Sequence, residues 1–323
     1  MNGNWTDAQQ QLIHETIRDE VEDSRLAHKI IPEYSLVSSA RAVAADTFSY
    51  VTKRVDDETQ LSLDERQEPF SLTRQQAEDS DLSSAVVVIR HATQRLAIDH
   101  DTRVFQNAIR DTINTAALTV AADKVPGASP EAVKAGQDAE ASFNKIQDVD
   151  RNGNSGEGMV GATAAAVATL DGEGYRTGYV MVAGTEIYKR LHTRAPGAAD
   201  LPIVAVRGLL DGGPVHRSTV LPTDEALVLS VGAGRIDRAV AVAPSAEFLR
   251  IEAAAGDELR LLRVYERFLT RFKETKSAVL LRLKAAPAPG APAPGAALLA
   301  LAHLMLRTWH GWVRRPISRH ERW

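Results

Sequence analysis

One stretch of this chain begins like a loop that binds calcium. Asp148, Asp150 and Asn152 alternate before Gly153, and carboxylate and amide oxygens at this spacing are typical calcium ligands. Such a loop also needs a bidentate carboxylate at its twelfth position, where this chain has Met159. We therefore interpret the stretch as an Asx-rich loop without a metal.

A second stretch is spelled like a dinucleotide-binding fingerprint, with Gly156, Gly158 and Gly161 at the required spacing. That fingerprint works only when a buried strand leads into the glycines and a helix follows them. A helix is predicted over 162–170, but the preceding residues, DVDRNGNS, do not have the pattern of a strand. We expect no bound cofactor.

No set of residues in the sequence converges in a way that would support acid–base or metal chemistry. Asp99, His100 and Asp101 are adjacent, and neighbours on a helix point about 100° apart. His91 and Arg95 lie one turn apart but do not form a metal pair. The sequence has no Ser-His-Asp order, His-x-x-x-His pair or phosphate loop. These absences favour a protein that is not an enzyme.

The composition narrows the class of protein further. The chain has 323 residues, enough for one large or two medium domains, and its formal net charge of −4 does not favour a nucleic-acid-binding protein. Without cysteine there is no disulfide and no thiolate metal site. We expect no secretory signal, because no charged start precedes an apolar run. We also expect no spanning helix, since no window approaches about 18 uninterrupted apolar residues.

An extended arm is predicted between residues 51 and 70. Apolar or β-branched residues recur here roughly every second position among charged ones, at Val55, Thr59, Leu61 and Leu63. This pattern is typical of a hairpin with one solvent-exposed face. Such a hairpin buries too little apolar surface to fold alone, so it must lie on something else. Phe70 closes the arm.

Two helices are predicted from apolar stripes. After the arm, Ala85, Ile89, Ala92 and Leu96 are spaced four, three and four, so they share one face of a long spine helix. At the N-terminus, residues 6–29 have the pattern of one amphipathic helix. The stripe of this first helix consists of Leu12, Ile13, Ile17, Val21 and Leu26.

The segments PFSLTRQQAED and RLAIDHDTRVFQNA resemble the encapsulins, or linocin-type bacteriocins, shell proteins with the fold of tailed-phage major capsid proteins. The matching positions are Pro69, Phe70 and Arg74 at the end of the arm and Asp101, Phe105 and Asn107, in place of a glycine, at the end of the spine helix. Asparagine is the next most tolerant residue of a left-handed helix end. The resemblance implies an α+β fold with an N-terminal helix, an extended loop, a peripheral domain and an axial domain.

Later segments follow the family in the same order, so that the resemblance spans residues 12–283. Residues 178–191 predict a buried strand, a turn at Gly184 and a helix, and ALVLSVGAG resembles the central axial strand. Two alternating runs about Gly256 and Asp257 predict a hairpin. Positions similar to the family's last strand and helix are Glu266, Phe268, Arg271, Ala278, Val279 and Leu281.

The resemblance also implies domain boundaries. We assign the N-terminal helix and its connection to residues 1–48, the extended loop to 49–74, the peripheral domain to 75–122 and 248–284, the axial domain to 123–247, a Pro/Ala linker to 285–296 and a basic amphipathic segment to 297–323.

Contact sites follow from the same resemblance. The groove for a cargo's targeting peptide is assigned to Leu12, Ile13, Ile17 and Phe268. His192 and Arg194 fall in the loop around the five-fold pore. Contact with a neighbouring subunit is assigned to Val55, Leu61, Leu63 and Phe70 of the arm. A helix that only covers core, and a merely solvated loop histidine, remain the alternatives.

The C-terminal segment has no counterpart in the family. Its apolar stripe consists of Leu298, Leu301, Met305, Trp309 and Trp312. With its arginines, this stripe can lie on an anionic membrane surface, dock into a groove of a partner or of the shell, or remain poorly ordered.

The function expected from this resemblance is that of a protomer of a cytoplasmic shell of about 60 copies, which encloses a cargo enzyme and passes small solutes through pores. We expect no cofactor, although some family members carry a flavin, and no nucleic acid, because acidic residues dominate the N-terminal helix. A phage or prophage capsid protein that encloses DNA is the first alternative. A membrane-associated binding protein that acts through the basic segment is the second.

Overall fold

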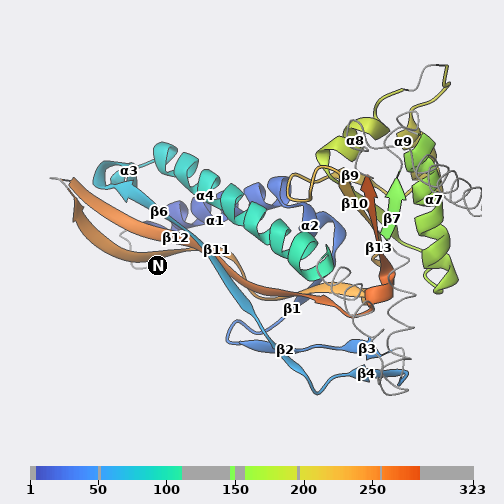
Figure 1. Ribbon diagram of the computed structural model, residues 1–323. Coiled ribbons are helices and arrows are strands. Elements are labelled where there is room, and N and C mark those ends of the chain that lie inside the picture. The colour runs from blue at the N-terminus through green and yellow to red at the C-terminus, as the bar shows by residue number, and fades with distance from the viewer. Residues whose placement is uncertain are drawn as a thin grey trace, which may run out of the picture. The chain divides into compact units, whose positions relative to one another are not determined.

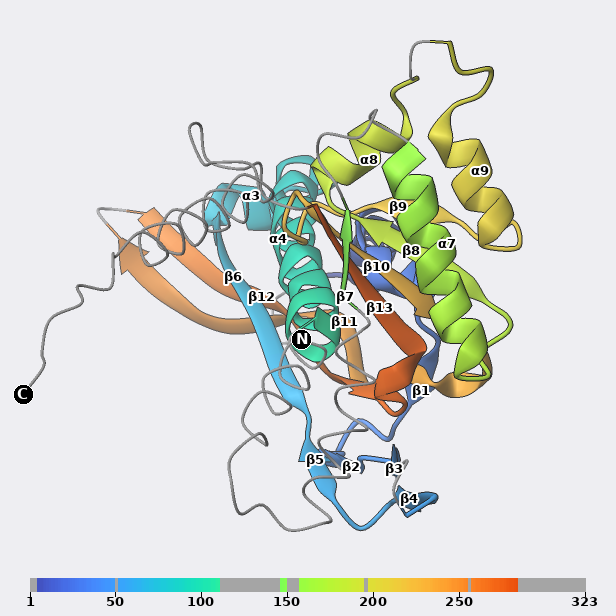
Figure 2. The same ribbon diagram turned by 45° about the vertical axis from the view of Figure 1, so that its right-hand side comes forward.

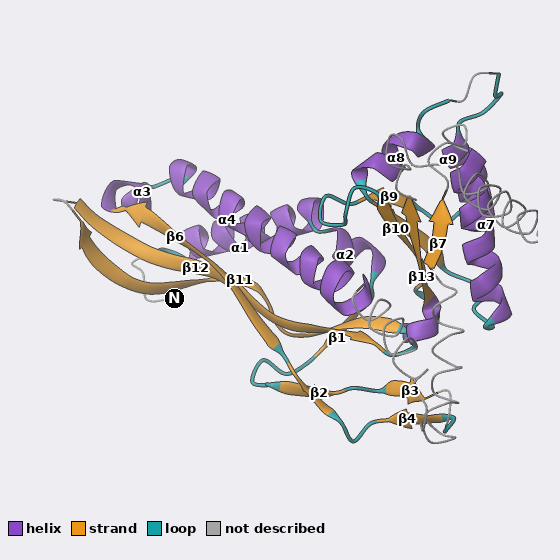
Figure 3. Ribbon diagram, in the orientation of Figure 1, coloured by secondary structure: helices purple, strands orange, loops and turns teal. Residues whose placement is uncertain are grey.

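The computed structural model describes residues 5–49, 52–110, 146–149, 157–194, 197–254 and 257–283 (Figure 1). These residues belong to one compact unit, Met1–Lys284, whereas the second unit, Ala285–Trp323, lies outside the described residues. Helices and strands are mixed along the chain (Figure 3), which agrees with the predicted α+β class.

The N-terminal helical segment consists of two helices, α1 (Asp7–Ser24) and α2 (Leu26–Ile30), where the sequence predicted one. A capping box starts α1: the Thr6 side chain accepts from the backbone N–H of Gln9, and the Gln9 side chain accepts from the backbone N–H of Thr6. The break is at Arg25, which has extended backbone angles (φ −87°, ψ 114°).

The predicted spine helix is confirmed as α4 (Ser83–Thr102). Its stripe residues Ala85, Ile89, Ala92 and Leu96 are all buried. The prediction of an end at Asn107 is wrong, because the chain continues as a π-helix, η1 (Arg103–Arg110), and Asn107 is not among the described non-glycine residues with positive φ.

A four-stranded sheet carries α1 and α4 on one face (Figure 1). Its order is β1 (Glu33–Ser35), β11 (Ile236–Ala254), β12 (Asp257–Phe272) and β6 (Asp64–Thr73). The predicted hairpin is confirmed, since β11 and β12 pair antiparallel up to Ala254 and Asp257. Burial alternates along the edge strand β6, and this strand leads into the short helix α3 (Arg74–Glu78).

A five-stranded sheet has the order β7 (Ile146–Val149), β13 (Ala278–Leu283), β10 (Glu225–Ser230), β8 (Tyr179–Ala183) and β9 (Val215–Arg217). The segment that resembled the central axial strand is β10, which is fully buried at the centre of this sheet. β13 joins the same sheet as a strand, so the expectation of a final helix in the peripheral domain is wrong.

Both faces of the five-stranded sheet are apolar. Alternate residues such as Met181, Val228 and Val279 face one core, and their neighbours Val182, Leu227 and Leu280 face the other. The first core is covered by α7 (Glu157–Gly172), α8 (Thr185–Leu191) and α9 (Pro202–Leu209), and the second by α2 and η1.

The predicted strand–turn–helix over 178–191 is confirmed as β8, Gly184 and α8. A Cβ at Gly184 would lie 2.1 Å from the carbonyl oxygen of Pro222, so this close turn admits no side chain. The sequence did not predict α9, and it did not predict the strand β7, which precedes Gly156 after all.

The predicted arm consists of two small sheets. β2 (Ala42–Ala44) pairs with β5 (Gln60–Ser62), and β3 (Thr47–Ser49) pairs with β4 (Arg54–Asp56). The arm therefore starts about ten residues earlier than predicted. Figure 2 shows β6 running from the four-stranded sheet toward the arm strands.

Candidate functional site

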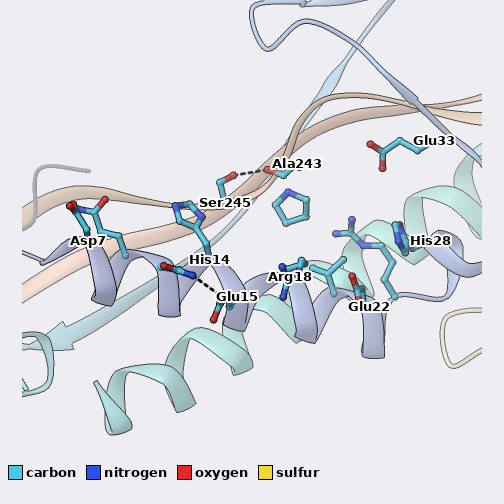
Figure 4. A pocket seen from close by; sticks show the side chains of 14 residues that line it. Asp7, His14, Glu15, Arg18, Glu22, His28, Glu33, Ala243 and Ser245 are labelled. Carbon is cyan, nitrogen blue, oxygen red and sulfur yellow. Dashed lines mark hydrogen bonds between the residues drawn. The ribbon is translucent and has the colours of Figure 1, made fainter. Parts of the chain in front are cut away.

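A groove of about 780 Å³ follows the first helix (Figure 4). One wall is α1 between Asp7 and Glu22, and His28 and Glu33 stand at one end. The other wall is the stretch 243–245 of β11. The pairing of β11 with β12 slips on both sides of Val242, and a proline at position 244 has no N–H for the ladder.

The groove is lined mainly by the polar face of α1, and Val21 is the one residue of the apolar stripe that reaches it. Ile13 and Ile17 are completely buried among Ala85, Ile89 and their neighbours, so they cannot form the cargo contact assigned to them. Leu12 is 37% exposed but does not line the groove. The 3.6-residue stripe of this helix marks the side that packs against α4, whereas the groove follows its polar side.

Phe268, also assigned to cargo contact, is buried behind this site. Its ring stacks on the His100 ring with a centroid separation of 3.8 Å. It contributes to the second core of the molecule and is not available to a peptide in this conformation.

A buried ion pair fixes the break between α1 and α2. Arg25 is 2% exposed and its Nη2 lies 3.0 Å from the carboxylate of Glu266 in β12. The Nδ1 atom of His100, in α4, lies 3.0 Å from the same carboxylate. Burial lowers the pKa of His100 to about 4, so the ring is neutral at pH 7, Nδ1–H donates to Glu266, and Arg25 supplies the balancing charge. We call Arg25, Glu266 and His100 the buried node.

Asp101, the acidic residue matched to the family, caps the second helix. Its carboxylate accepts from the backbone N–H groups of Leu26 (2.8 Å) and Ala27 (2.9 Å), at the positive end of α2. Burial raises the pKa of Asp101 to about 6 against the opposing effect of these hydrogen bonds. The residue thus ties the end of α4 to the start of α2.

A second buried arginine, Arg238, holds the two residues at the end of the groove. Nη2 of Arg238 donates to Nδ1 of His28 (3.1 Å), which leaves the ring proton on Nε2, and it lies 3.5 Å from Glu33. Burial and the adjacent Arg238 lower the pKa of His28, so this ring is neutral at pH 7.

Three arginines of β12 lie on the face of the four-stranded sheet opposite α4, and Arg271 among them contacts the arm. Arg263, Arg267 and Arg271 lie four residues apart on β12 and so project from the same face. We call them the arginine ladder. Their contacts are charged hydrogen bonds to β6, to β11 and to the arm, and no motif in the sequence predicted them.

The buried members of the ladder are Arg267 and Arg271. Arg267 donates to Glu65 (2.7 Å) and to the carbonyl oxygen of Ser38 (3.3 Å). Arg271 donates to Asp237 (2.6 and 2.7 Å), to Asp46 (2.6 Å) and to the carbonyl oxygen of Ala44 (3.1 Å). The hydrogen bond from Arg267 is the main cause that lowers the pKa of Glu65.

The apolar arm residues differ in exposure. Val55 is 54% exposed, and Leu61 and Leu63 are half-buried. Phe70 is half-buried against the core beneath α4. Only Val55 offers most of its side chain for a contact outside the subunit.

The residues assigned to the pore loop follow α8 directly. His192 and Arg194 are both exposed. The His192 ring lies 2.9 Å from the carbonyl oxygen of Tyr188, and Arg194 Nε donates to the carbonyl oxygen of Ala198 (2.7 Å). The loop is thus folded back on itself, and both side chains remain candidates for a pore.

Three further assignments concern metals, membranes and the tail. Within the described ranges, no three His, Cys, Asp or Glu side chains converge as metal ligands. None of the described helices is long and apolar enough to cross a membrane. Asp150 to Gly153 and the C-terminal stripe Leu298, Leu301, Met305, Trp309 and Trp312 lie outside the described residues.

Comparison with known proteins agrees with this architecture. A family model described as the encapsulating protein for peroxidase matches residues 138–268. The virus-like particle from Pyrococcus furiosus superimposes with a TM-score of 0.58 at 12% identity, covering 84% of this chain and 98% of that chain. The chain has the fold of encapsulins and tailed-phage major capsid proteins. The fold implied by the resemblance of the arm and the spine helix is thereby confirmed.

Both branches of this fold are represented among the similar structures. The encapsulin complex from Synechococcus elongatus PCC 7942 has a TM-score of 0.50 at 10% identity, covering 91% of this chain and 96% of that chain. The protein from Mycobacterium phage Adephagia has a TM-score of 0.52 at 12% identity, covering 82% of this chain and 92% of that chain. A search of curated proteins gave no match.

Proposed function

We propose that this protein is the protomer of a self-assembling shell that encloses a cargo protein in the cytoplasm. The observation that carries the proposal is the capsid-type fold together with the match to the encapsulating-protein model over residues 138–268. An arm tethered along β12, with Val55 exposed at its far part, suits a contact with a neighbouring copy.

Cargo docking and solute passage extend this proposal. The groove beside α1 is the cargo site, and His192 and Arg194 line the pore that small solutes pass. The shell has no catalytic residues or cofactor of its own. About 60 copies make the smallest closed icosahedral shell.

A phage capsid protein is the second candidate, because the fold of the protein from Mycobacterium phage Adephagia is similar to the same extent. The charge of the first helix favours protein cargo. Its residues 7–24 contain six carboxylates and one arginine, and a surface that holds DNA needs the opposite sign.

The test is size-exclusion chromatography followed by negative-stain microscopy of the purified full chain. We expect uniform hollow particles with co-purified protein. Val55→Asp should abolish assembly, whereas Val55→Thr, which keeps the shape of the side chain, should retain it. Monomers or dimers at every salt and protein concentration tried would refute the shell, and co-purified DNA would select the capsid protein.

A further inference from the structure

The groove beside α1 presents more negative than positive charge. Its walls carry four carboxylates and two guanidinium groups. Both guanidinium groups form ion pairs with carboxylates that do not line the groove: Arg18 with Asp19 (3.0 Å) and Arg25 with Glu266 (3.0 Å). The carboxylates facing the groove are Asp7, Glu15, Glu22 and Glu33, of which Glu33 is also paired with a residue outside the groove, Arg238 (3.5 Å).

At the end of the groove, His28 offers a hydrogen-bond donor to a ligand, whereas Arg25 does not. Arg25 lines the groove, and its Nε–H is buried without a hydrogen-bond acceptor among the described residues. That nitrogen is enclosed and the Arg25 side chain is 2% exposed, so a ligand does not contact it. His28, next to it, keeps its proton on Nε2 because Nδ1 accepts from Arg238.

The dimensions suit an extended peptide. From Asp7 to Glu22 the wall rises 15 residues, or about 22 Å at 1.5 Å per helical residue. An extended chain advances about 3.3 Å per residue, so about seven peptide residues fit alongside. Glu15 and Glu22 are two turns apart, about 10 Å, which matches basic side chains on roughly every third residue.

We infer that this groove binds an extended basic segment of a partner protein. Its lysine or arginine side chains meet Glu15 and Glu22, and one of its backbone carbonyls accepts from Nε2 of His28. This inference rests on the proposed cargo function and specifies the chemistry of the cargo segment. It replaces the apolar peptide implied by Ile13 and Ile17, because these two side chains are buried in the core.

The test measures binding of fluorescein-labelled eight-residue peptides to the full-length protein by fluorescence anisotropy. The probes are a Gly/Ser peptide with three lysines, its analogue with three glutamates and its analogue with three leucines. The matched variants are Glu22→Lys and Asp23→Lys. They make the same charge change at adjacent exposed positions, but only Glu22 lines the groove.

We expect the lysine peptide to bind at least tenfold tighter than the other two at about 0.05 M salt, where charges are weakly screened. Glu22→Lys should weaken it about three- to tenfold and Asp23→Lys about twofold or less. Equal or tighter binding of the leucine peptide, or equal effects of the two variants, would overturn the inference.

Assembly, scored by microscopy on the same samples, is an independent readout. If particles form but the lysine peptide is not preferred, the shell stands and the basic segment is wrong. If the peptide binds with the expected sensitivity and no particles ever form, the groove stands and the shell is wrong.

Discussion

The two sheets of this protein are stabilised in different ways. The five-stranded sheet is apolar on both faces, and its central strand β10 is buried at every position. The four-stranded sheet has an apolar core under α1 and α4, but it also carries the buried node on that face and the arginine ladder on the other. Burial of apolar area is non-directional, whereas charged hydrogen bonds require one geometry. The first sheet therefore supplies stability, and the second fixes the positions of the first helix and the arm.

The largest effect should come from breaking the buried node. Glu266→Gln leaves the Arg25 charge buried without its counterion, and loss of one partner of a buried pair typically costs about 3–5 kcal/mol. Urea unfolding of the unassembled protein measures this loss of stability. Glu247→Gln, which removes a partner of Arg263 at the surface, is the control and should cost less than about 1 kcal/mol. Equal effects would mean that the node is not a critical contact.

Truncation of apolar side chains should separate the two sheets. Leu227 in β10 is completely buried, whereas Leu249 in β11 is 45% exposed. Leu227→Ala should lower the free energy of unfolding by about 2–5 kcal/mol, and Leu249→Ala by less than about 1 kcal/mol. Comparable losses in both variants would contradict the division drawn between the sheets.

Acidification should change the stability through two buried groups, His100 and Asp101, whose effects oppose each other. The pKa of His100 is lowered from 6.5 to about 4, so protonation of the unfolded chain removes stability as the pH falls from about 6.5 to 4. The pKa of Asp101 is raised from 3.8 to about 6, so proton uptake by the folded chain adds stability as the pH falls from about 6 to 4. Each change amounts to about 3 kcal/mol, and in the native protein the two largely cancel.

Substitution of either residue should therefore make the effect of the other on stability measurable. Between pH 7 and pH 4, Asp101→Asn should lose about 3 kcal/mol more stability than the native protein, and His100→Gln should lose about 3 kcal/mol less. Unfolding by urea at each pH measures the difference in slope, which is independent of any constant cost of the substitution. Parallel pH profiles for all three proteins would show that these groups do not titrate as their burial requires.

The smallest effect concerns the arginine ladder. Arg267→Ala removes the hydrogen bonds to Glu65 and Ser38, which should cost about 1–2 kcal/mol and loosen the arm. Limited proteolysis of this variant within residues 38–62 should be faster than that of the native protein. In the native protein, cleavage of the arm should become faster as salt is added, because salt screens the ion pairs. Arg250→Ala, which affects a pair exposed at the hairpin, is the control and should leave arm cleavage unchanged. Unaltered cleavage in Arg267→Ala would show that the ladder does not hold the arm.

Much of the fold could be predicted because its signals are local. The stripe from Ala85 to Leu96 has the period of a helix, and the runs on either side of Gly256 have the period of two strands. The candidate site was predicted less well. The polar residues Glu15 and Glu22 carried no signal of their own, because polar residues on an amphipathic helix are ordinarily just solvated.

The sequence by itself determined the spine helix, the β11–β12 hairpin, the strand–turn–helix at Gly184 and the similarity to the shell-protein fold, since these signals depend on residues close together in the chain. Only the tertiary structure decided what each face meets. The stripe of Ile13 and Ile17 says which side of the first helix is apolar, but not whether core or a ligand covers it. The break at Arg25 depends on Glu266, 241 residues away, and such a pairing leaves no periodicity in the sequence. The tertiary structure buries the predicted apolar contact of the first helix and opens the groove on its polar, acidic face.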